Sequence, residues 1–238
     1  MTTELLFRND AYLKSCTAKV EGMNERGGIL LDRTVFYATA GGQPGDRGAL
    51  SYSGGSVPIA TTVYDDTKNI VHVPGAAAGL ELNAPVTLAL DWETRYRNMR
   101  AHTLMHLLCA NVPYPVTGGA ITEDGGRIDF DIPEGGIPDK TELARKINAL
   151  IKEDHPVSSR WISDEELEAN PHLIRTMSVK PPTGTGRVRL VAIGEDGRVD
   201  LQPCGGTHVR STGEIGPIAV AKIENKGKMN RRIRLVFA

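Results

Sequence analysis

The stretch "AHTLMHLLCA" at residues 101–110 places His102 and His106 four positions apart in an apolar run. On a helix, this spacing brings the two Cβ atoms to about 5–6 Å, which suits two ligands of one metal ion. The helix itself offers no third ligand on that face. The pair therefore predicts a metal site only if another part of the chain supplies more ligands.

A second pair follows about a hundred residues later, where "PCGGTHV" separates Cys204 from His208 by three residues. Two of these three are glycines, which allow a tight turn and leave room around an ion. One thiolate and three imidazoles form a tetrahedral, borderline-soft set of the kind that binds zinc. Each pair alone often arises by chance or as part of a core, but together they predict one zinc ion per chain.

The other histidines and cysteines lie in loop-like or isolated settings, and we interpret them as structural: His72, His155, His172, Cys16 and Cys109. Position 103 is Thr, where zinc peptidases of the His-Glu-x-x-His type carry their general-base Glu. A peptidase activity is therefore not expected.

Two main helices are predicted after residue 90, and the first of them positions the histidine pair. The helix that carries the pair is predicted to begin at Asp91, which can cap it, and to end before Pro113. A second helix is predicted over 139–154, where Asp139 and Glu142 form a capping-box pair.

Five short β-branched runs lie within residues 15–90, separated by Gly, Asn, Asp and Pro: "CTAKVEGM", "GGILLDRTVFYAT", "SVPIATTVYDD", "NIVHVPG" and "APVTLALD". They predict a small barrel or a sandwich. Beyond them, the two helices alternate with further elements: a strand "RIDFDIP", a short acidic helix "SDEELEAN", and the strands "RVRLVAI", "VDLQPC", "IGPIAVAKIE" and "RRIRLVFA". We therefore expect an α+β chain, with an all-β domain over 1–91 and an α+β domain over 92–238 that has an antiparallel sheet and two main helices.

Composition sets limits on the function. The chain has 238 residues, 40% of them hydrophobic and 24% charged, with a net charge of −1, so any attraction to nucleic acid must come from a local patch. Its three cysteines are odd in number and scattered, which argues against disulfides and for a reducing compartment. No window approaches the roughly 20 apolar residues of a membrane span. We expect a cytoplasmic protein with no membrane association.

The motifs "HTLMH" and "CGGTH", preceded by "TVFYATAGGQPGDRG" at 34–48, together resemble the editing domain of alanyl-tRNA synthetases. They are most similar to the free-standing form, the AlaX trans-editing family. The resemblance covers nearly the whole chain. It implies an N-terminal β-barrel that carries the Gly-Gly-Gln segment, followed by a zinc-binding editing domain.

The resemblance also implies an activity. Family members hydrolyse mischarged tRNA(Ala), chiefly seryl-tRNA and in some cases glycyl-tRNA. Serine must be removed in this way because a synthetase pocket built for alanine discriminates against an added hydroxyl by only about 10²-fold. The implied enzyme is an aminoacyl-tRNA hydrolase whose partner is mischarged tRNA(Ala), with no obligate protein partner. Its zinc ligands would be His102, His106, Cys204 and His208.

Two further residues take catalytic roles in this resemblance. The family Gln falls on Gln43, and the Thr that contacts the serine hydroxyl falls on Thr34, with Thr39 as a competitor. The common segment reads Phe-Tyr-Pro-Thr-Gly-Gly-Gly-Gln, whereas this chain has Ala38 and Ala40 in place of the Pro and the first Gly. Ala40 restricts the loop backbone. The alternative for this segment is a Gly-rich hairpin loop with Asp46 and Arg47 solvated.

The role of the zinc is open at this point. Three protein ligands would leave a position for water or substrate, whereas four would close the site. Our hypothesis is that the ion anchors the aminoacylated 3′ end and that His208 is its least firmly bound ligand.

RNA contact is expected from the segment 222–234, whose cations are Lys222, Lys226, Lys228, Arg231, Arg232 and Arg234. A loop around Gly227 would follow phosphates, and the alternative is a solvated basic hairpin. A weaker basic patch is expected at 95–100.

Two other functions compete with editing. The first is a non-catalytic zinc-stabilised tRNA-binding module. The second is a peptide-release-type hydrolase, suggested by Gly-Gly-Gln alone, in which the four metal ligands would have no role. The sequence does not indicate the preference between serine and glycine, how tRNA(Ala) identity is read, or the oligomeric state.

Overall fold

The computed structural model describes residues 3–77, 79–133, 136, 138–177 and 186–238. The chain divides into two compact units, Met1–Tyr96 and Arg97–Ala238. Helix α1 (Trp92–Asn111) belongs to both, because the division falls in its second turn. The expected division into functional domains at 1–91 and 92–238 stays a prediction.

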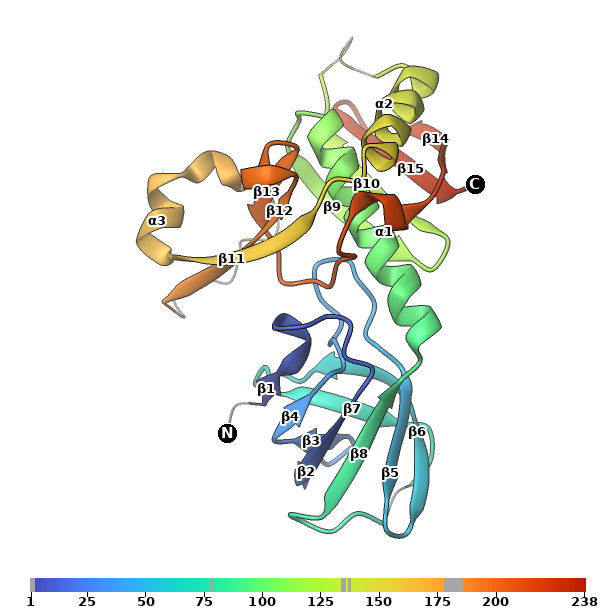
Figure 1. Cartoon of the computed structure of the whole chain (residues 1–238), viewed down its shortest axis with the longest axis vertical. Helices are drawn as coiled ribbons and strands as arrows, with labels where there is room; N and C mark the ends of the chain where they lie inside the picture. Colours follow the sequence, from blue (N-terminus) through green and yellow to red (C-terminus); the bar gives the residue numbers. More distant parts are fainter. Residues whose placement is uncertain (1–2, 78, 134–135, 137, 178–185) are drawn as a thin grey trace. The chain divides into compact units, whose positions relative to one another are not determined.

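The first unit is a closed antiparallel barrel of six strands in the order β2-β3-β7-β6-β5-β8 (Figure 1). Its strands are β2 (Ser15–Met23), β3 (Ile29–Leu31), β5 (Gly48–Tyr52), β6 (Gly55–Tyr64), β7 (Ile70–Pro74) and β8 (Pro85–Leu90). Buried residues alternate along β2, β6 and β8, as expected when one face of each strand points into a barrel. Outside the barrel, β1 (Glu4–Leu5) pairs in parallel with β4 (Arg33–Thr34), and a 3-10 turn, η1 (Leu6–Arg8), follows β1.

A buried ion pair ties the start of α1 to the barrel. The Arg95 side chain has no exposed surface, and its guanidinium binds the Asp46 carboxylate, with 3.0 Å from Nε to each oxygen. It also donates to the carbonyl oxygens of Val35 and Ala11. The expected basic patch at 95–100 is therefore wrong for Arg95, and Asp46 is not a solvated turn residue, because a buried charge needs a partner of the opposite sign.

The second unit is α+β, which confirms the expected fold class. Its four-stranded antiparallel sheet has the order β14-β15-β10-β9, and a three-stranded antiparallel sheet has the order β11-β12-β13. The strands are β9 (Val116–Thr122), β10 (Gly125–Asp131), β11 (Val157–Ser163), β12 (Arg187–Ile193), β13 (Asp200–Pro203), β14 (Ile218–Asn225) and β15 (Asn230–Phe237). The helices are α1, α2 (Lys140–Lys152) and α3 (Asp164–Ala169), with the 3-10 turns η2 (Pro171–Leu173), η3 (Glu195–Gly197) and η4 (Thr212–Ile215).

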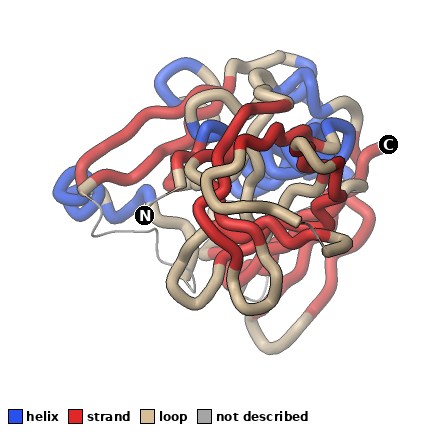
Figure 2. The backbone as a smooth tube through the Cα atoms, turned by 90° about the horizontal axis from the view of Figure 1, so that it is seen from below, coloured by secondary structure: helices blue, strands red, loops and turns tan. Residues whose placement is uncertain are grey.

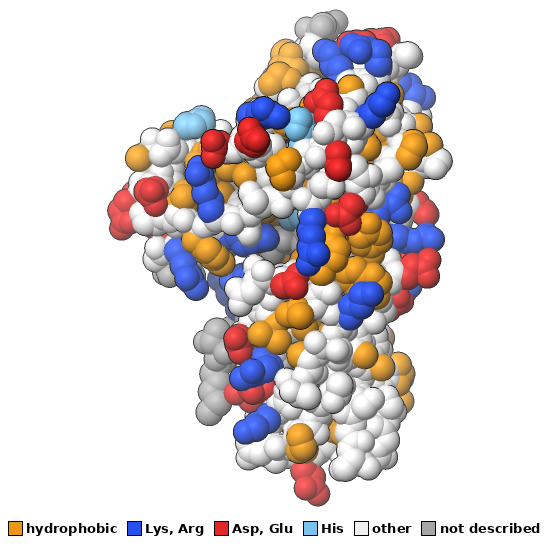
Figure 3. Space-filling view, in the orientation of Figure 1, with side chains coloured by type: hydrophobic (Ala, Val, Ile, Leu, Met, Phe, Trp, Pro, Cys, Tyr) orange, Lys and Arg blue, Asp and Glu red, His pale blue; other side chains and the backbone are white. Residues whose placement is uncertain are grey.

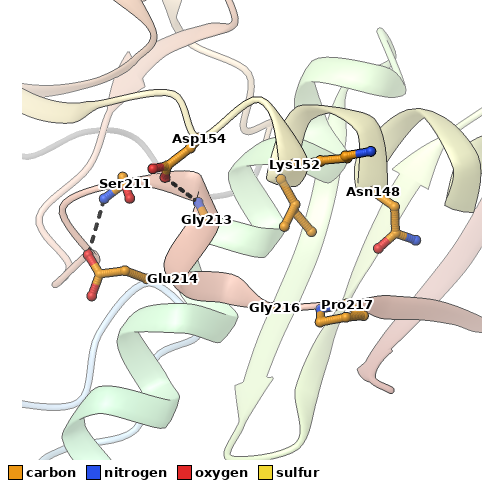
Figure 4. A pocket seen from close by; sticks show the side chains of 9 residues that line it. Asn148, Lys152, Asp154, Ser211, Gly213, Glu214, Gly216 and Pro217 are labelled. Atoms are coloured by element: carbon orange, nitrogen blue, oxygen red, sulfur yellow. Dashed lines mark hydrogen bonds between the residues drawn. The ribbon is translucent and has the colours of Figure 1, made fainter.

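Helices α1 and α2 cover one face of the four-stranded sheet. A Cβ at Gly126 of β10 would lie 2.9 Å from the sulfur of Met105, so α1 packs directly on this glycine. On α2, Asn148, which is labelled in Figure 4, exchanges two hydrogen bonds with the backbone of Ile218 at the start of β14. Figure 1 draws both helices on the same side of the strands.

The helix ends follow the local sequence. Asp91 accepts the Thr94 N–H at 3.2 Å, and Asp139 accepts the Glu142 N–H at 2.8 Å, so both expected caps are present. The Glu142 carboxylate binds the Arg145 guanidinium at 2.7 Å. The ion pair with Arg145 therefore takes the place of the reciprocal half of the expected capping box.

Strands and loops make up most of the chain, as Figure 2 shows. Among the described residues, no helix combines the length and the apolar character needed to cross a membrane. Figure 3 shows Lys and Arg side chains interspersed with Asp and Glu on the face drawn, in keeping with a net charge near zero.

Candidate metal centre

The structure brings the two predicted ligand pairs together inside the second unit. Ligand atoms of His102, His106, Cys204 and His208 all lie within 4.8 Å of one another. Cys204 Sγ lies 3.4 Å from Nε2 of His102 and 3.4 Å from Nε2 of His208. The histidine pair comes from α1, and the other pair comes from the loop between β13 and η4.

The dimensions of the cluster suit a metal ion. In a tetrahedral zinc site with bonds of 2.0–2.3 Å, neighbouring ligand atoms are about 3.5 Å apart. The two sulfur–nitrogen distances of 3.4 Å match that edge. The histidine side chains are nearly buried, with exposed fractions of 7% for His102, 5% for His106 and 6% for His208. This cluster of sulfur and imidazole donors can hold a metal ion.

Arg189 of β12 holds the loop that carries Cys204. Its guanidinium donates to the carbonyl oxygens of Cys204 and Gly206, each at 3.0 Å, and the Cys204 N–H donates to the Arg189 carbonyl. The Gly206 N–H points at Cys204 Sγ, 3.4 Å away. Neither Gly205 nor Gly206 has a positive φ, so these glycines supply room and close approach rather than an unusual backbone conformation.

A carboxylate orients His106. Asp200 Oδ2 accepts a hydrogen bond from His106 Nδ1 at 2.8 Å and another from the Gln202 side-chain amide at 2.8 Å. Because a carboxylate only accepts, the proton must sit on Nδ1 of His106, which leaves Nε2 free to bind an ion. Asp200 is 2% exposed, so little water competes for it.

A neutral hydroxyl orients His208. Thr103 Oγ1 donates to the Met99 carbonyl at 3.0 Å and lies 3.1 Å from His208 Nδ1 and 3.3 Å from the Val209 N–H. Since the single hydroxyl hydrogen goes to Met99, the oxygen accepts from Nδ1 and directs Nε2 towards the cluster. This contact also explains why Thr occupies position 103.

The cluster shifts the acidity of its members. Burial opposes ionisation of Cys204, but the charge of His102 and its hydrogen bond lower the pKa of the thiol well below 9.0, which favours the thiolate, the form of Cys that binds metal ions. Burial alone would lower the pKa of His106, but the hydrogen bonds to Asp200 and Cys204 raise it to about 10 without metal, so a metal ion would have to displace the proton from Nε2 to bind there. Burial, reinforced by the charge of His102, lowers the pKa of His208 and favours its neutral, ligating form.

Sequence reasoning missed these supporting residues, although one signal was present. In "VDLQPC", Asp200, Gln202 and Cys204 follow at intervals of two, and such residues share one face of a strand. The role of Thr103 had no comparable signal, because its partners lie on two separate segments.

The predicted catalytic residues lie in the first unit. Thr34 has no exposed surface, and its hydroxyl lies 2.8 Å from His72 Nε2 and accepts the Phe36 N–H at 2.9 Å. The competing Thr39 is exposed, and its hydroxyl binds the Thr62 carbonyl and the Gly45 N–H. The role expected for Thr34 stays a prediction.

Gln43 closes a tight turn. Ala40 and Gln43 exchange backbone hydrogen bonds of 2.9 and 3.2 Å, and φ is 56° at Gly41 and 82° at Gly42. Positive φ at both central residues is typical of a type I′ turn, which glycines adopt without strain. Ala40 lies outside those two positions, so the turn tolerates it. The Gln43 side chain is buried, and its catalytic role also stays a prediction.

The predicted nucleic-acid-binding segment forms the hairpin of β14 and β15. Lys222, Lys226, Lys228 and Arg234 are exposed.

Two arginines of this segment are already engaged. Arg231 is 6% exposed and donates to the carbonyl oxygens of its own loop at Gly227, Lys228 and Asn230. Arg232 binds both oxygens of Asp129, at 2.7 and 2.8 Å. The placement of Arg231 disfavours a phosphate contact, and the RNA-binding role of the segment stays a prediction.

Comparison with known proteins shows which protein families this chain resembles. Residues 188–234 match the model of the "Threonyl and Alanyl tRNA synthetase second additional domain", and residues 7–94 match that of "tRNA synthetases class II (A)". The chain is 35% identical to the alanyl-tRNA editing protein AlaX-M of Methanosarcina acetivorans, with 97% of each chain covered. It is 31% identical to AlaX-M of Saccharolobus solfataricus, again over 97% of each chain. It is 36% identical to the alanine–tRNA ligase of Pyrobaculum arsenaticum, of which it spans 25%.

The barrel, the α+β unit and the His/Cys cluster thus define a protein of the class related to threonyl- and alanyl-tRNA synthetases. The synthetase match covers only a quarter of that enzyme, whereas each of these AlaX-M matches covers 97% of both chains. The chain belongs to the AlaX family of alanyl-tRNA editing proteins.

Proposed function

We propose that this protein is an aminoacyl-tRNA hydrolase that removes serine from mischarged tRNA(Ala), with glycyl-tRNA(Ala) as a second substrate. The observation that carries the proposal is the buried cluster of three histidines and one cysteine in a chain that matches AlaX-M over 97% of its length. The proposed place of action is the cytoplasm, where aminoacyl-tRNA is used.

The proposed metal is zinc, held by His102, His106, Cys204 and His208, because sulfur and imidazole are the donors that zinc prefers. When bound, zinc supplies a Lewis acid that can hold the aminoacylated 3′ end and polarise its ester carbonyl. His208 is the ligand most easily displaced in this proposal. The support is chemical: Asp200 strengthens His106 as a donor, whereas Thr103 gives His208 only a neutral partner.

Two residues of the first unit have proposed catalytic roles. The hydroxyl of Thr34 would recognise the serine hydroxyl, and the amide of Gln43 would position the attacking water. Thr34 is buried, so it must become accessible and give up its hydrogen bond to His72 before it can bind substrate. Thr39 is already exposed. Thr34→Val and Thr39→Val, compared on seryl-tRNA and glycyl-tRNA, separate the two candidates, because only serine offers a hydroxyl to lose.

The decisive experiment incubates the protein with seryl-, glycyl- and alanyl-tRNA(Ala), with and without a chelator, and measures zinc per chain. We expect selective, chelator-sensitive release of serine, and a zinc content that His208→Ala lowers less than His106→Ala does. Tight tRNA binding without turnover would favour the non-catalytic module. Full deacylation by metal-free protein would contradict the proposed role of zinc.

A further inference from the structure

The four-stranded sheet of the second unit has a face that α1 and α2 do not cover. Side chains alternate along a strand, and residues opposite each other on antiparallel strands share a face. Gly126 of β10 faces α1, so its neighbour Arg127 points to the other side. We call this side the outer face. It contains Arg127 and Asp129 of β10 together with their cross-strand partners.

A row of three cations crosses the outer face. Lys222 of β14 lies opposite Arg234 of β15, and Arg234 lies opposite Arg127 of β10. Because neighbouring strands are about 4.8 Å apart, the row is about 10 Å long. It ends on β9 at Ala120, which is opposite Arg127 and has no long side chain to block an approach.

The next row holds two of these cations, Arg127 and Lys222, in place. Here Glu224, Arg232, Asp129 and Gly118 lie opposite one another, so charges alternate along the row. Asp129 binds Arg127 at 2.8 Å, and Glu224 binds Lys222 at 3.0 Å.

The two rows together carry a surplus of positive charge. Four cations stand against two carboxylates, a surplus of two. Arg234 and Lys222 are the exposed members, and 66% of the Lys222 side chain is accessible.

We propose that the outer face docks the phosphate backbone of an RNA duplex stem along the row Lys222–Arg234–Arg127. A line of cations on a flat surface matches a line of phosphates, and such contacts give affinity without reading sequence. Single-stranded RNA is a poorer match, because its binding sites use aromatic side chains on which bases stack, and none of the described residues of the two rows is aromatic. The proposal rests on the proposed function, and it adds Arg127 from outside the expected segment.

The test compares two charge reversals of equal size. Lys222→Glu with Arg234→Glu alters the outer face, and Lys146→Glu with Lys152→Glu alters exposed positions of α2 in the same unit. Binding of uncharged tRNA(Ala) and of its acceptor-stem hairpin is measured over a range of salt concentrations. Deacylation is measured on seryl-tRNA(Ala) and on a seryl ester of the terminal CCA trinucleotide, which lacks a duplex.

We expect the outer-face variant to bind both RNAs at least tenfold more weakly, because two phosphate contacts are lost. The slope of log K against log salt should fall by about two, one for each lost phosphate contact. KM on seryl-tRNA should rise, with kcat and the trinucleotide reaction unchanged.

An equal loss of RNA affinity in both double variants would overturn the proposal of a docking face. A loss of activity on the trinucleotide ester would overturn it as well. Unchanged RNA affinity in the outer-face variant would also overturn it and leave the face open to a protein partner. Because binding of uncharged RNA does not require turnover, this result stands apart from any failure of the deacylation assay.

Discussion

Two residues that contact the His/Cys cluster differ in charge, and we expect their substitution to change the affinity for a metal ion by different amounts. Asp200 holds His106 with a full negative charge, whereas Thr103 holds His208 with a neutral hydroxyl. We expect Asp200→Asn to weaken zinc binding by about 10–100-fold, and Thr103→Val to weaken it less. Competition with a chromophoric chelator measures both affinities.

Matched variants make this comparison specific. Asp196→Asn removes a carboxylate from the surface turn η3, and Thr103→Ser retains the hydroxyl, so both should keep wild-type affinity. An effect of Thr103→Val as large as that of Asp200→Asn would contradict the idea that His208 is the weaker ligand.

At the scale of single residues, the sequence predicted which His and Cys residues lie together better than it predicted their surroundings. His102 with His106, and Cys204 with His208, are visible because each pair has a fixed local spacing. Arg95 and Arg231 were read as surface cations, but one is paired with Asp46 and the other with its own loop. Their partners depend on tertiary structure, which local spacing does not encode.

Among the elements, strand β7 makes the barrel sensitive to acid. His72 is fully buried, and this burial lowers its pKa from 6.5 to about 4. In the unfolded chain, His72 takes up a proton below pH 6.5, but in the folded barrel it does so only below about pH 4. The contribution of His72 to the free energy of unfolding is therefore fully present above pH 6.5. It decreases as the pH drops towards 4, by about 3 kcal/mol in total.

The measurement follows hydrogen exchange of barrel amides between pH 7 and pH 4.5, corrected for intrinsic exchange rates. We expect the exchange-competent open states to become more populated as the pH falls. His72→Gln cannot take up a proton and should show a flatter dependence in this window. An equal pH dependence in both proteins would assign the acid sensitivity to other groups.

The strands that the sequence analysis missed have weak local signals. Strands β1, β5, β9 and β11 were not predicted, and β1 has only two residues. β5 begins at Gly48, where a Cβ would meet the Ala89 carbonyl, and β9 contains Gly118 and Gly119, so both resemble turns in sequence. β11 is largely exposed and lacks an apolar alternation. The helices were predicted closely, because their caps and ends are local signals.

For the whole molecule, the expected α+β class and the barrel were correct, and the resemblance to the AlaX family contributed most to choosing a barrel over a sandwich. Composition alone could not show where the charged side chains lie on the surface, because a net charge of −1 is compatible with a local basic face. The outer face became visible only from strand register.

Metal binding should raise the thermal stability of the protein. A ligand that binds only the folded state adds about 2.7 kcal/mol at a concentration 100 times its Kd. We expect Tm to rise with zinc concentration in a thermal unfolding assay, and not with magnesium, which prefers oxygen ligands. Cys204→Ala and His102→Ala should lose the shift. A shift that persists in both variants would place the zinc elsewhere.

The ligand pairs are separated by about a hundred residues of chain. A zinc ion bound between them would join these two distant segments of the folded chain, and its free energy of binding would add to the stability of the folded state. The yield of folded protein would then depend on the concentration of available zinc. Under metal scarcity, the cell would first lose folded protein to proteolysis, before any surviving molecule became less accurate.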